Sequence, residues 1–224
     1  MILTFDLDDT LYDERSFVHS GFLKVADYVK NVYGINPESA LDIMHDELET
    51  HGRGKVFDQL LLAYKVYSKA AVQKCVSVYR LHDPDIKLNP DAVRCLERFK
   101  RFNKYLLTDG NKIVQRNKVK ALGLFPVMKK VFITHEYGKK NAKPSVYCFQ
   151  RIAQIEKTVP EDIIYIADNP QKDFINIKKL GFKAIRIRQG MFADLYLGPE
   201  YEGHFEISCL DELTLSLIEK LGQV

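Results

Sequence analysis

Five short apolar runs constrain the fold of this chain more than any other feature of its sequence. Each run is four or five residues long, a length and composition typical of buried strands. Helix-like segments separate the later runs, and strands that alternate with helices indicate a parallel sheet covered on both faces. We therefore predict an α/β fold with a Rossmann-like parallel sheet. The runs are ILTF (2–5), KYLLT (104–108), VFIT (131–134), IIYIA (163–167) and AIRI (184–187).

Three segments between or after these runs have the pattern of helices: KIVQRNKVKALGL (112–124), SVYCFQRIAQI (145–155) and QKDFINIKKLGF (171–182). The third has Pro170 just before it and Gly181 near its end, an order that favours a helix. FEI (205–207) and a helix over 211–222 are expected to close the chain.

One interval, from about residue 13 to residue 82, contains no strand-like run. Its pattern predicts four amphipathic helices that form a smaller, lid-like domain, and the proline-containing stretch 83–92 is typical of a connector. We thus expect an α/β core over 1–13 and 84–224 and an α-helical cap over 14–83. The helices are expected at 16–35, 37–52, 55–67 and 68–83.

The composition excludes several classes of protein. A net charge of +3 over 224 residues, without a dense basic run, is not typical of nucleic-acid binding. No apolar run approaches the ~20 residues of a membrane span, and an acid follows the first five residues, so we expect no membrane anchor and no signal peptide. The four scattered cysteines are typical of a reducing compartment, and we expect a cytoplasmic protein.

Polar segments follow four of the apolar runs or lie in the loops after them. In an open parallel sheet, ligands bind outside the carboxyl ends of the strands, so these segments should lie together. They supply carboxylates, a hydroxyl, a lysine and helix N-termini, which are the groups that bind a metal ion and a phosphate. The segments are DLDDT (6–10), TDGN (108–111), KKNAKP (139–144) and ADNPQKD (167–173).

Together the four segments resemble the four motifs of the haloacid dehalogenase (HAD) superfamily, in their usual order. The helical interval after the first motif is similar to the α-helical cap of that family. The resemblance covers essentially the whole chain and implies a hydrolase. Two positions depart from the pattern of many relatives: Ala167 stands in place of a glycine and Asp109 in place of an asparagine. We expect the Asp109 side chain to turn away from phosphate, so that only its backbone binds.

The two acids of the first segment have distinct expected roles. Asp6 is ionised at neutral pH and needs no base to act as a nucleophile on a phosphomonoester. Asp8, two residues on, lies on the same side of an extended chain and could protonate the leaving alcohol, then deprotonate water. We expect the charge of its neighbour to raise the pKa of Asp8. Asp9 points the other way and is expected to be a structural hydrogen-bond acceptor.

A phosphate dianion cannot approach these acids without a cation, because two like charges at ~4 Å repel by about 4 kcal/mol at an effective dielectric of ~20. Mg²⁺ prefers oxygen ligands and is the expected cofactor. Asp6 and Asp168 are the expected direct ligands, and Asp173 is expected to orient metal-bound water. The resemblance adds the backbone carbonyl of Asp8. Phosphate is expected to contact Lys143, Thr108 and the backbone N–H groups of Asp109 and Gly110.

Four other basic residues have no specific catalytic role in this interpretation. Lys139 and Lys140 are expected to face solvent. Arg53 and Lys55 lie in a glycine-containing loop between two cap helices. Such a loop could contact an anionic substrate, or its charges could simply keep the loop solvated; the sequence favours neither.

The function expected from these residues is a Mg²⁺-dependent phosphatase that hydrolyses a small phosphorylated metabolite, a sugar phosphate or a nucleotide, through an aspartyl-phosphate on Asp6. A phosphomutase of the same superfamily would use the same four motifs. A dehalogenase is disfavoured because it needs neither Asp8 nor the metal-binding acids. A non-catalytic module that binds a phosphorylated ligand is the alternative from another class. The oligomeric state and the identity of the metabolite stay open.

Overall fold

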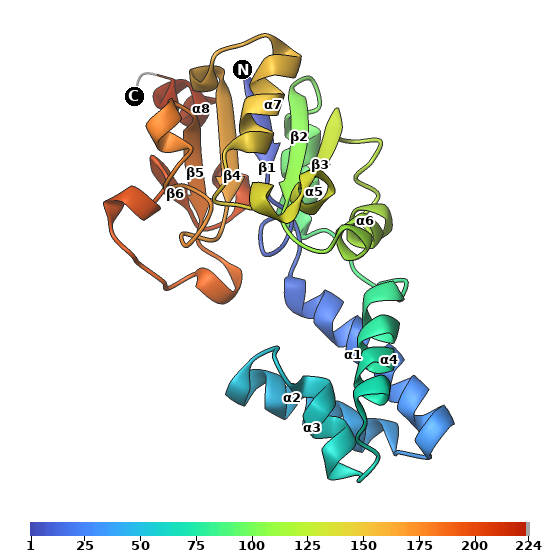
Figure 1. The fold of residues 1–224 in the computed structure, drawn as a ribbon. Coiled ribbons are helices and arrows are strands. Elements are labelled where there is room, and N and C mark those ends of the chain that lie inside the picture. The colour runs from blue at the N-terminus through green and yellow to red at the C-terminus, as the bar shows by residue number, and fades with distance from the viewer. Residues whose placement is uncertain (223–224) are drawn as a thin grey trace. The chain divides into compact units, whose positions relative to one another are not determined.

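A six-stranded sheet forms the centre of the larger part of the molecule (Figure 1). The computed structural model describes residues 1–222, so the last two residues of the expected core range lie outside the description. The strand order is β3-β2-β1-β4-β5-β6 and every neighbouring pair is parallel, which confirms the predicted sheet. The strands are β1 (Ile2–Phe5), β2 (Asn103–Thr108), β3 (Lys130–Ile133), β4 (Ile163–Ala167), β5 (Lys183–Ile187) and β6 (Phe205–Ile207).

The central strands are buried along their whole length, as expected for a parallel sheet that is covered on both faces. Side chains alternate between the two faces, so Tyr105 and Leu107 of β2 lie on one face together with Tyr165 of β4. Helix α7 (Tyr147–Glu156) covers this face through Phe149 and Ile152, which belong to the same apolar cluster. The remaining helices of this part are α5 (Pro90–Arg98), α6 (Lys112–Ala121) and α8 (Leu215–Leu221).

Two predictions of local structure are wrong. The connector expected over 83–92 ends at Asn89, because Pro90 occupies the first turn of α5, a helix that we did not predict. The helix expected over 171–182 is a series of turns with a single short 3₁₀ segment, Lys178–Leu180. The side chains of Asn169 and Asp173 accept hydrogen bonds from the backbone N–H groups of Gln171 and Asn169, respectively. Such bonds compete with the helical pattern.

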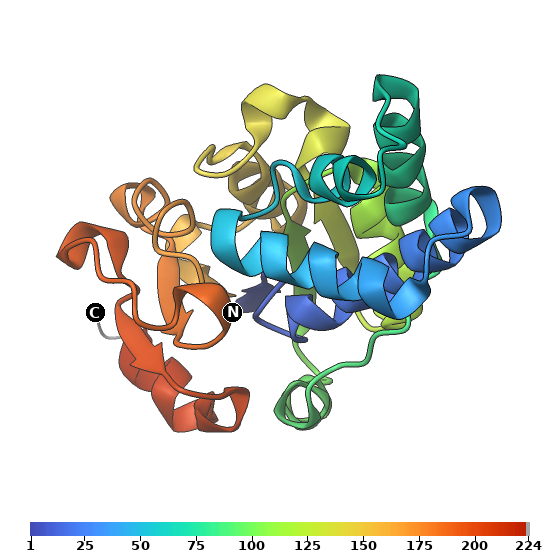
Figure 2. The same cartoon turned by 90° about the horizontal axis from the view of Figure 1, so that it is seen from below.

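By internal contacts the chain divides into two compact units: residues 1–14 with 87–222, and Arg15–Ile86. The second unit contains the four predicted helices, coloured blue to teal in Figure 2. They share a buried apolar cluster that includes Phe22 and Val25 of the first helix and Leu60 of the third. The side chains of Asn36 and Ser68 cap the second and fourth helices. The helices are α1 (Glu14–Tyr33), α2 (Pro37–His51), α3 (Val56–Ala63) and α4 (Lys69–Leu81).

The four cysteines are free thiols, and three of them are buried. Of the helices within residues 1–222, none has both the length and the apolar character that crossing a bilayer requires.

Candidate active site

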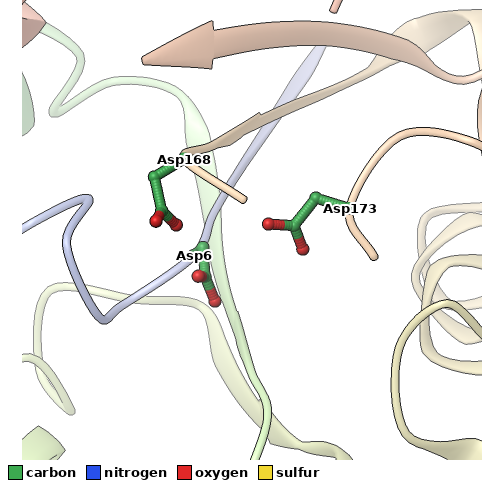
Figure 3. Close-up of side chains that lie close together, drawn as sticks. All are labelled: Asp6, Asp168 and Asp173. Carbon is green, nitrogen blue, oxygen red and sulfur yellow. The ribbon is translucent and has the colours of Figure 1, made fainter. Parts of the chain in front are cut away.

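The carboxyl ends of β1 and β4 bring three acids together. Figure 3 shows Asp6 after β1, Asp168 after β4 and Asp173 on the loop that follows. One carboxylate oxygen from each residue lies within 4.8 Å of the other two, and all three side chains are buried. The backbone N–H of Asp6 donates to the carbonyl of Ile166 at 2.9 Å, which extends the β1–β4 pairing to this residue. We call Asp6, Asp168 and Asp173 the acidic cluster.

Lys143 brings a positive charge into the acidic cluster. Its Nζ lies 2.9 Å from Oδ1 of Asp6 and 2.7 Å from Oδ1 of Asp173, and it also contacts the hydroxyl of Tyr165 at 2.9 Å. Burial opposes the charged form of this lysine, but the carboxylates of Asp173 and Asp6 outweigh it and raise its pKa well above the ordinary value. The lysine therefore stays protonated and compensates part of the cluster's negative charge.

The remaining charge of the acidic cluster is not compensated. Three carboxylates and one ammonium group leave a formal charge of −2 when all are ionised. Burial, followed by the charges of Asp6 and Asp173, raises the pKa of Asp168 to about 9. Burial is also the main cause that raises the pKa of Asp6 to about 6, against the effect of Lys143. No group within residues 1–222 donates a hydrogen bond to the Asp168 carboxylate.

This donor set fits a divalent cation. Its ligand atoms are carboxylate oxygens, which hard cations such as Mg²⁺ prefer over nitrogen and sulfur ligands. A charge of +2 would match the uncompensated charge, and it would favour the ionised form of Asp6 and Asp168. Three of the four residues that the sequence predicts at the metal, Asp6, Asp168 and Asp173, thus lie together, and their role as ligands stays a prediction.

Asp8 belongs to a separate group of side chains. Its Oδ1 accepts hydrogen bonds from Lys118 Nζ at 2.7 Å and from the hydroxyl of Tyr12 at 2.5 Å. Its Oδ2 accepts a hydrogen bond from Gln115 Nε2 at 2.7 Å. The same Nε2 lies 2.9 Å from the hydroxyl oxygen of Thr108. We call Asp8, Tyr12, Thr108, Gln115 and Lys118 the Asp8 cluster.

The expectation of a raised pKa for Asp8 is wrong. Burial acts in that direction, but the charge and hydrogen bond of Lys118, together with the hydrogen bonds of Tyr12 and Gln115, lower the pKa below its ordinary value. The charge of the neighbouring Asp6 is outweighed by Lys118, which is 110 positions away in the chain but in direct contact with Asp8. The lowered pKa favours the ionised form of Asp8.

Three of the four residues expected to bind phosphate, Thr108, Asp109 and Gly110, lie at the end of β2 and in the turn before α6. Thr108 is fully buried, and Gly110 has φ +137°, a conformation that side chains rarely adopt. The Asp109 carboxylate accepts hydrogen bonds from the hydroxyl of Thr134 and, at 3.1 Å, from the backbone N–H of Lys143. The Asp109 side chain therefore anchors the loop that carries Lys143.

Asp9 is the structural hydrogen-bond acceptor that we expected. Its carboxylate accepts from the backbone N–H groups of Glu14 at 2.9 Å and Met191 at 3.2 Å. Lys139 and Lys140 are exposed, as expected.

Arg53 and Lys55 belong to the helical unit. Both are exposed, and Lys55 immediately precedes α3. Arg53 lines a cavity of about 110 Å³ whose other walls include Phe22, Phe57 and Tyr79. Contact of Arg53 and Lys55 with a substrate stays a prediction.

Three residues of the site, Gln115, Lys118 and Tyr165, are not predicted by the sequence motifs. Gln115 and Lys118 lie three positions apart on α6, so both side chains fall on one helix face. The signal available in the sequence was a polar pair on a face that must be buried against the sheet.

Comparison with known proteins identifies the family. The family model for haloacid dehalogenase-like hydrolases matches residues 1–181, and the chain belongs to this family. Among curated proteins, the chain is similar to glyceraldehyde 3-phosphate phosphatase of Methanocaldococcus jannaschii, with 28% identity over 218 residues that cover 94% of each chain.

Two solved structures share the fold. One is the HAD-hydrolase YfnB from Bacillus subtilis bound to magnesium, with a TM-score of 0.66, 20% identity and coverage of 95% of this chain and 96% of that chain. The other is 2-haloacid dehalogenase from Pseudomonas syringae pv. Tomato DC3000, also with a TM-score of 0.66 and 20% identity, covering 98% of this chain and 100% of that one. Because these two neighbours bear different names, the reaction has to be argued from the site.

Proposed function

We propose that this protein is a Mg²⁺-dependent phosphatase that hydrolyses a small phosphomonoester through an aspartyl-phosphate on Asp6. The observation that carries the proposal is the uncompensated charge of the acidic cluster, which has three buried carboxylates and one lysine. One of these carboxylates, Asp6, is able to act as nucleophile. Displacement of a halide would not require this arrangement. The curated relative, named as a phosphatase, supports the same choice.

Asp6 is the proposed nucleophile. Lys143 binds its Oδ1, which leaves Oδ2 to attack phosphorus. The new bond joins Oδ2 to phosphorus, and the bond between phosphorus and the leaving oxygen breaks. Lys143 also places a positive charge where the transferred phosphoryl oxygens gather negative charge.

Asp8 is the proposed general acid and base. It donates a proton to the leaving alkoxide and then removes a proton from the water that attacks the aspartyl-phosphate, which restores Asp6 and releases phosphate. The resting carboxylate is ionised, and the approach of a phosphate dianion favours its protonated form. Thr108 and the backbone N–H groups of Asp109 and Gly110, close to the start of α6, would donate hydrogen bonds to the phosphate.

Asp6 and Asp168, with the backbone carbonyl of Asp8, would hold the metal, and Asp173 would orient its water ligands. When bound, Mg²⁺ neutralises charge on the phosphate and so permits its approach to Asp6.

The helical unit Arg15–Ile86 is the proposed cap, which would exclude water during phosphoryl transfer. A cap favours small substrates, and the relative's name makes glyceraldehyde 3-phosphate the first compound to test. Arg53 and Lys55 are the proposed cap residues that meet an anionic group of the substrate.

The test is release of phosphate from a panel of phosphorylated metabolites, with and without Mg²⁺, by the wild type and Asp6→Asn. Asparagine has nearly the same shape but is a poor nucleophile. We expect metal-dependent release that Asp6→Asn abolishes. Release that survives the substitution would contradict the nucleophile assignment. Formation of an isomeric sugar phosphate without free phosphate would instead indicate a mutase, and halide release from a 2-haloacid would indicate a dehalogenase.

A further inference from the structure

We propose that Gln115 and Lys118 of α6 are positioning residues, which hold the Asp8 carboxylate in a fixed orientation relative to the phosphate-binding hydroxyl of Thr108. This inference rests on the proposed function, because it assigns a role to residues that act through Asp8. Neither side chain belongs to the four sequence motifs.

The first support is the arrangement around the Gln115 amide. Nε2 lies 2.7 Å from Oδ2 of Asp8, 2.9 Å from Oγ1 of Thr108 and 2.7 Å from the backbone carbonyl of Asp109. A flipped amide would place its oxygen against a carboxylate and a carbonyl, which only accept hydrogen bonds, so the contacts themselves fix the orientation. One amide nitrogen therefore joins the proposed acid to two proposed phosphate-binding residues.

The second support is the burial of the amide. Gln115 is 2% exposed, and among the described residues its Oε1 is buried without a hydrogen-bond partner. A buried acceptor without a partner is unfavourable, so core packing alone does not explain a glutamine here. An apolar side chain of similar length would fill the space. The contacts of Nε2 are the feature that only the amide supplies.

The third support is that different donors bind the two oxygens of the Asp8 carboxylate. Lys118 Nζ and the Tyr12 hydroxyl bind Oδ1 of Asp8, while Gln115 binds Oδ2, so neither oxygen can turn without breaking a contact. Lys118 is 3% exposed and also contacts Glu14 at 3.3 Å. Because Gln115 and Lys118 are one helical turn apart on the same helix, α6 sets the position of both.

Gly110 fits the same arrangement. A Cβ atom at this position would lie 3.3 Å from Nε2 of Gln115, so the amide packs closely against the glycine backbone. The turn after β2 and the side chain of Gln115 thus fit each other. The Asp8 cluster forms one packed unit whose contacts are separate from the contacts that Lys143 makes in the acidic cluster.

The experiment uses the dependence of rate on the leaving group. An alkyl phosphate requires proton donation to its leaving oxygen, whereas p-nitrophenolate leaves without a proton. We would measure kcat and KM for glyceraldehyde 3-phosphate, or the alkyl phosphate that the wild type hydrolyses fastest, and for p-nitrophenyl phosphate under conditions where phosphoryl transfer to the enzyme limits the rate. The variants are Gln115→Met, Lys118→Met, Asp8→Asn and the double variant Asp8→Asn/Gln115→Met.

Gln115→Met is expected to lower kcat for the alkyl phosphate about 10- to 100-fold, with a much smaller effect on p-nitrophenyl phosphate. Lys118→Met should act in the same direction. The double variant should be no slower than Asp8→Asn, because Gln115 acts through Asp8. The affinity for Mg²⁺, measured by calorimetry, should not change.

The matched control is Val119→Ala, which removes buried volume from the same helix at a residue that is not a member of the Asp8 cluster. This substitution should lower thermal stability and leave unchanged the ratio of kcat for the alkyl phosphate to kcat for p-nitrophenyl phosphate. If Gln115→Met does not fold, Gln115→Leu, which is also apolar and lacks the amide, is measured in its place.

Equal losses on both substrates, no loss on either, or additive losses in the double variant would overturn the positioning role. Failure of the proposed function has a different signature: the wild type would release no phosphate, or Asp6→Asn would remain active. In that case Asp8→Asn would show no dependence on the leaving group.

Discussion

The ammonium nitrogen of Lys143 lies 2.9 Å from Oδ1 of Asp6, although 137 positions separate the two residues in the chain. The parallel sheet makes this contact possible, because the loops that follow its strands meet at one edge. Lys143 also binds Asp173, so one cation contacts two carboxylates of the acidic cluster.

Replacement of this cation is the first prediction. Lys143→Met keeps the length of the side chain and removes its charge, so kcat should fall about 10²-fold or more. The metal-free protein should lose about 3–5 kcal/mol of unfolding free energy, because two buried carboxylates lose their partner. Phosphate release and urea unfolding measure these effects. Lys140→Met, an exposed lysine of the same loop, is the control and should change neither quantity.

Asp168→Asn should have opposite effects on metal binding and on metal-free stability. Loss of a proposed direct ligand should raise the Kd for Mg²⁺ at least about 10-fold. Loss of a carboxylate whose pKa burial and like charges have raised to about 9 should stabilise the metal-free protein near neutral pH. Calorimetric titration and urea unfolding give the two quantities. Unchanged Mg²⁺ affinity would exclude Asp168 as a ligand. The control is Glu161→Gln, a substitution at an exposed position.

The stability of the metal-free protein should fall as pH rises. The pKa values of Asp6, about 6, and Asp168, about 9, both exceed the unfolded value of 3.8. The folded state therefore binds more protons than the unfolded state, from about pH 4 up to the folded pKa of each acid, and its stability decreases over that window. Urea unfolding with EDTA, at about pH 5 and about pH 8, tests the sign.

Excess Mg²⁺ should remove most of this decrease, because the ion favours the ionised carboxylates, and metal binding should release protons. In the absence of metal, the stability of Asp168→Asn should fall less with rising pH than the stability of the wild type. A metal-free stability that rises with pH over the same window would contradict the account of the acidic cluster.

A buried ion pair outside the acidic cluster should determine stability rather than chemistry. Arg186 of β5 is fully buried and binds both carboxylate oxygens of Glu202 at 2.5 Å, while its other terminal nitrogen binds the carbonyls of Phe192 and Leu195 at 2.7 Å. Glu202→Gln should cost about 3–5 kcal/mol of unfolding free energy, because it leaves a buried charge unpaired.

The matched control for this pair is Glu206→Gln. Glu206 pairs with Arg188 at a more exposed position, so this substitution should cost at most about 1 kcal/mol. Equal losses in the two variants would show that the buried arginine finds other compensation.

The strands and the acidic cluster could be predicted because their signals are local. Each strand is a short apolar run, and each functional segment lies beyond a strand end, so the parallel sheet brings Asp6, Asp168 and Lys143 together. The Asp8 cluster could not be predicted in this way. It depends on Lys118 and Gln115, whose contact with Asp8 follows from how α6 packs, and this packing reverses the expected direction of the Asp8 pKa shift.

The segment 171–182 shows a second limit of local patterns. Its apolar residues Phe174 and Ile177 have helical spacing and are buried as a helix would bury them. The side chains of Asn169 and Asp173 instead accept hydrogen bonds from backbone N–H groups, and the segment forms turns. Asp173 thereby gains a fixed position beside Lys143.

The measurement that tests the central claim most directly is the site of phosphorylation in Asp8→Asn. With p-nitrophenyl phosphate and Mg²⁺, the leaving group needs no acid, but attack of water lacks its base, so the aspartyl-phosphate should accumulate. Acid quenching and peptide mass spectrometry should find one added phosphoryl group on Asp6, with a stoichiometric burst of p-nitrophenolate, and neither in Asp6→Asn/Asp8→Asn. A phosphoryl group on another residue, or turnover without any phosphorylated enzyme, would contradict the proposed mechanism.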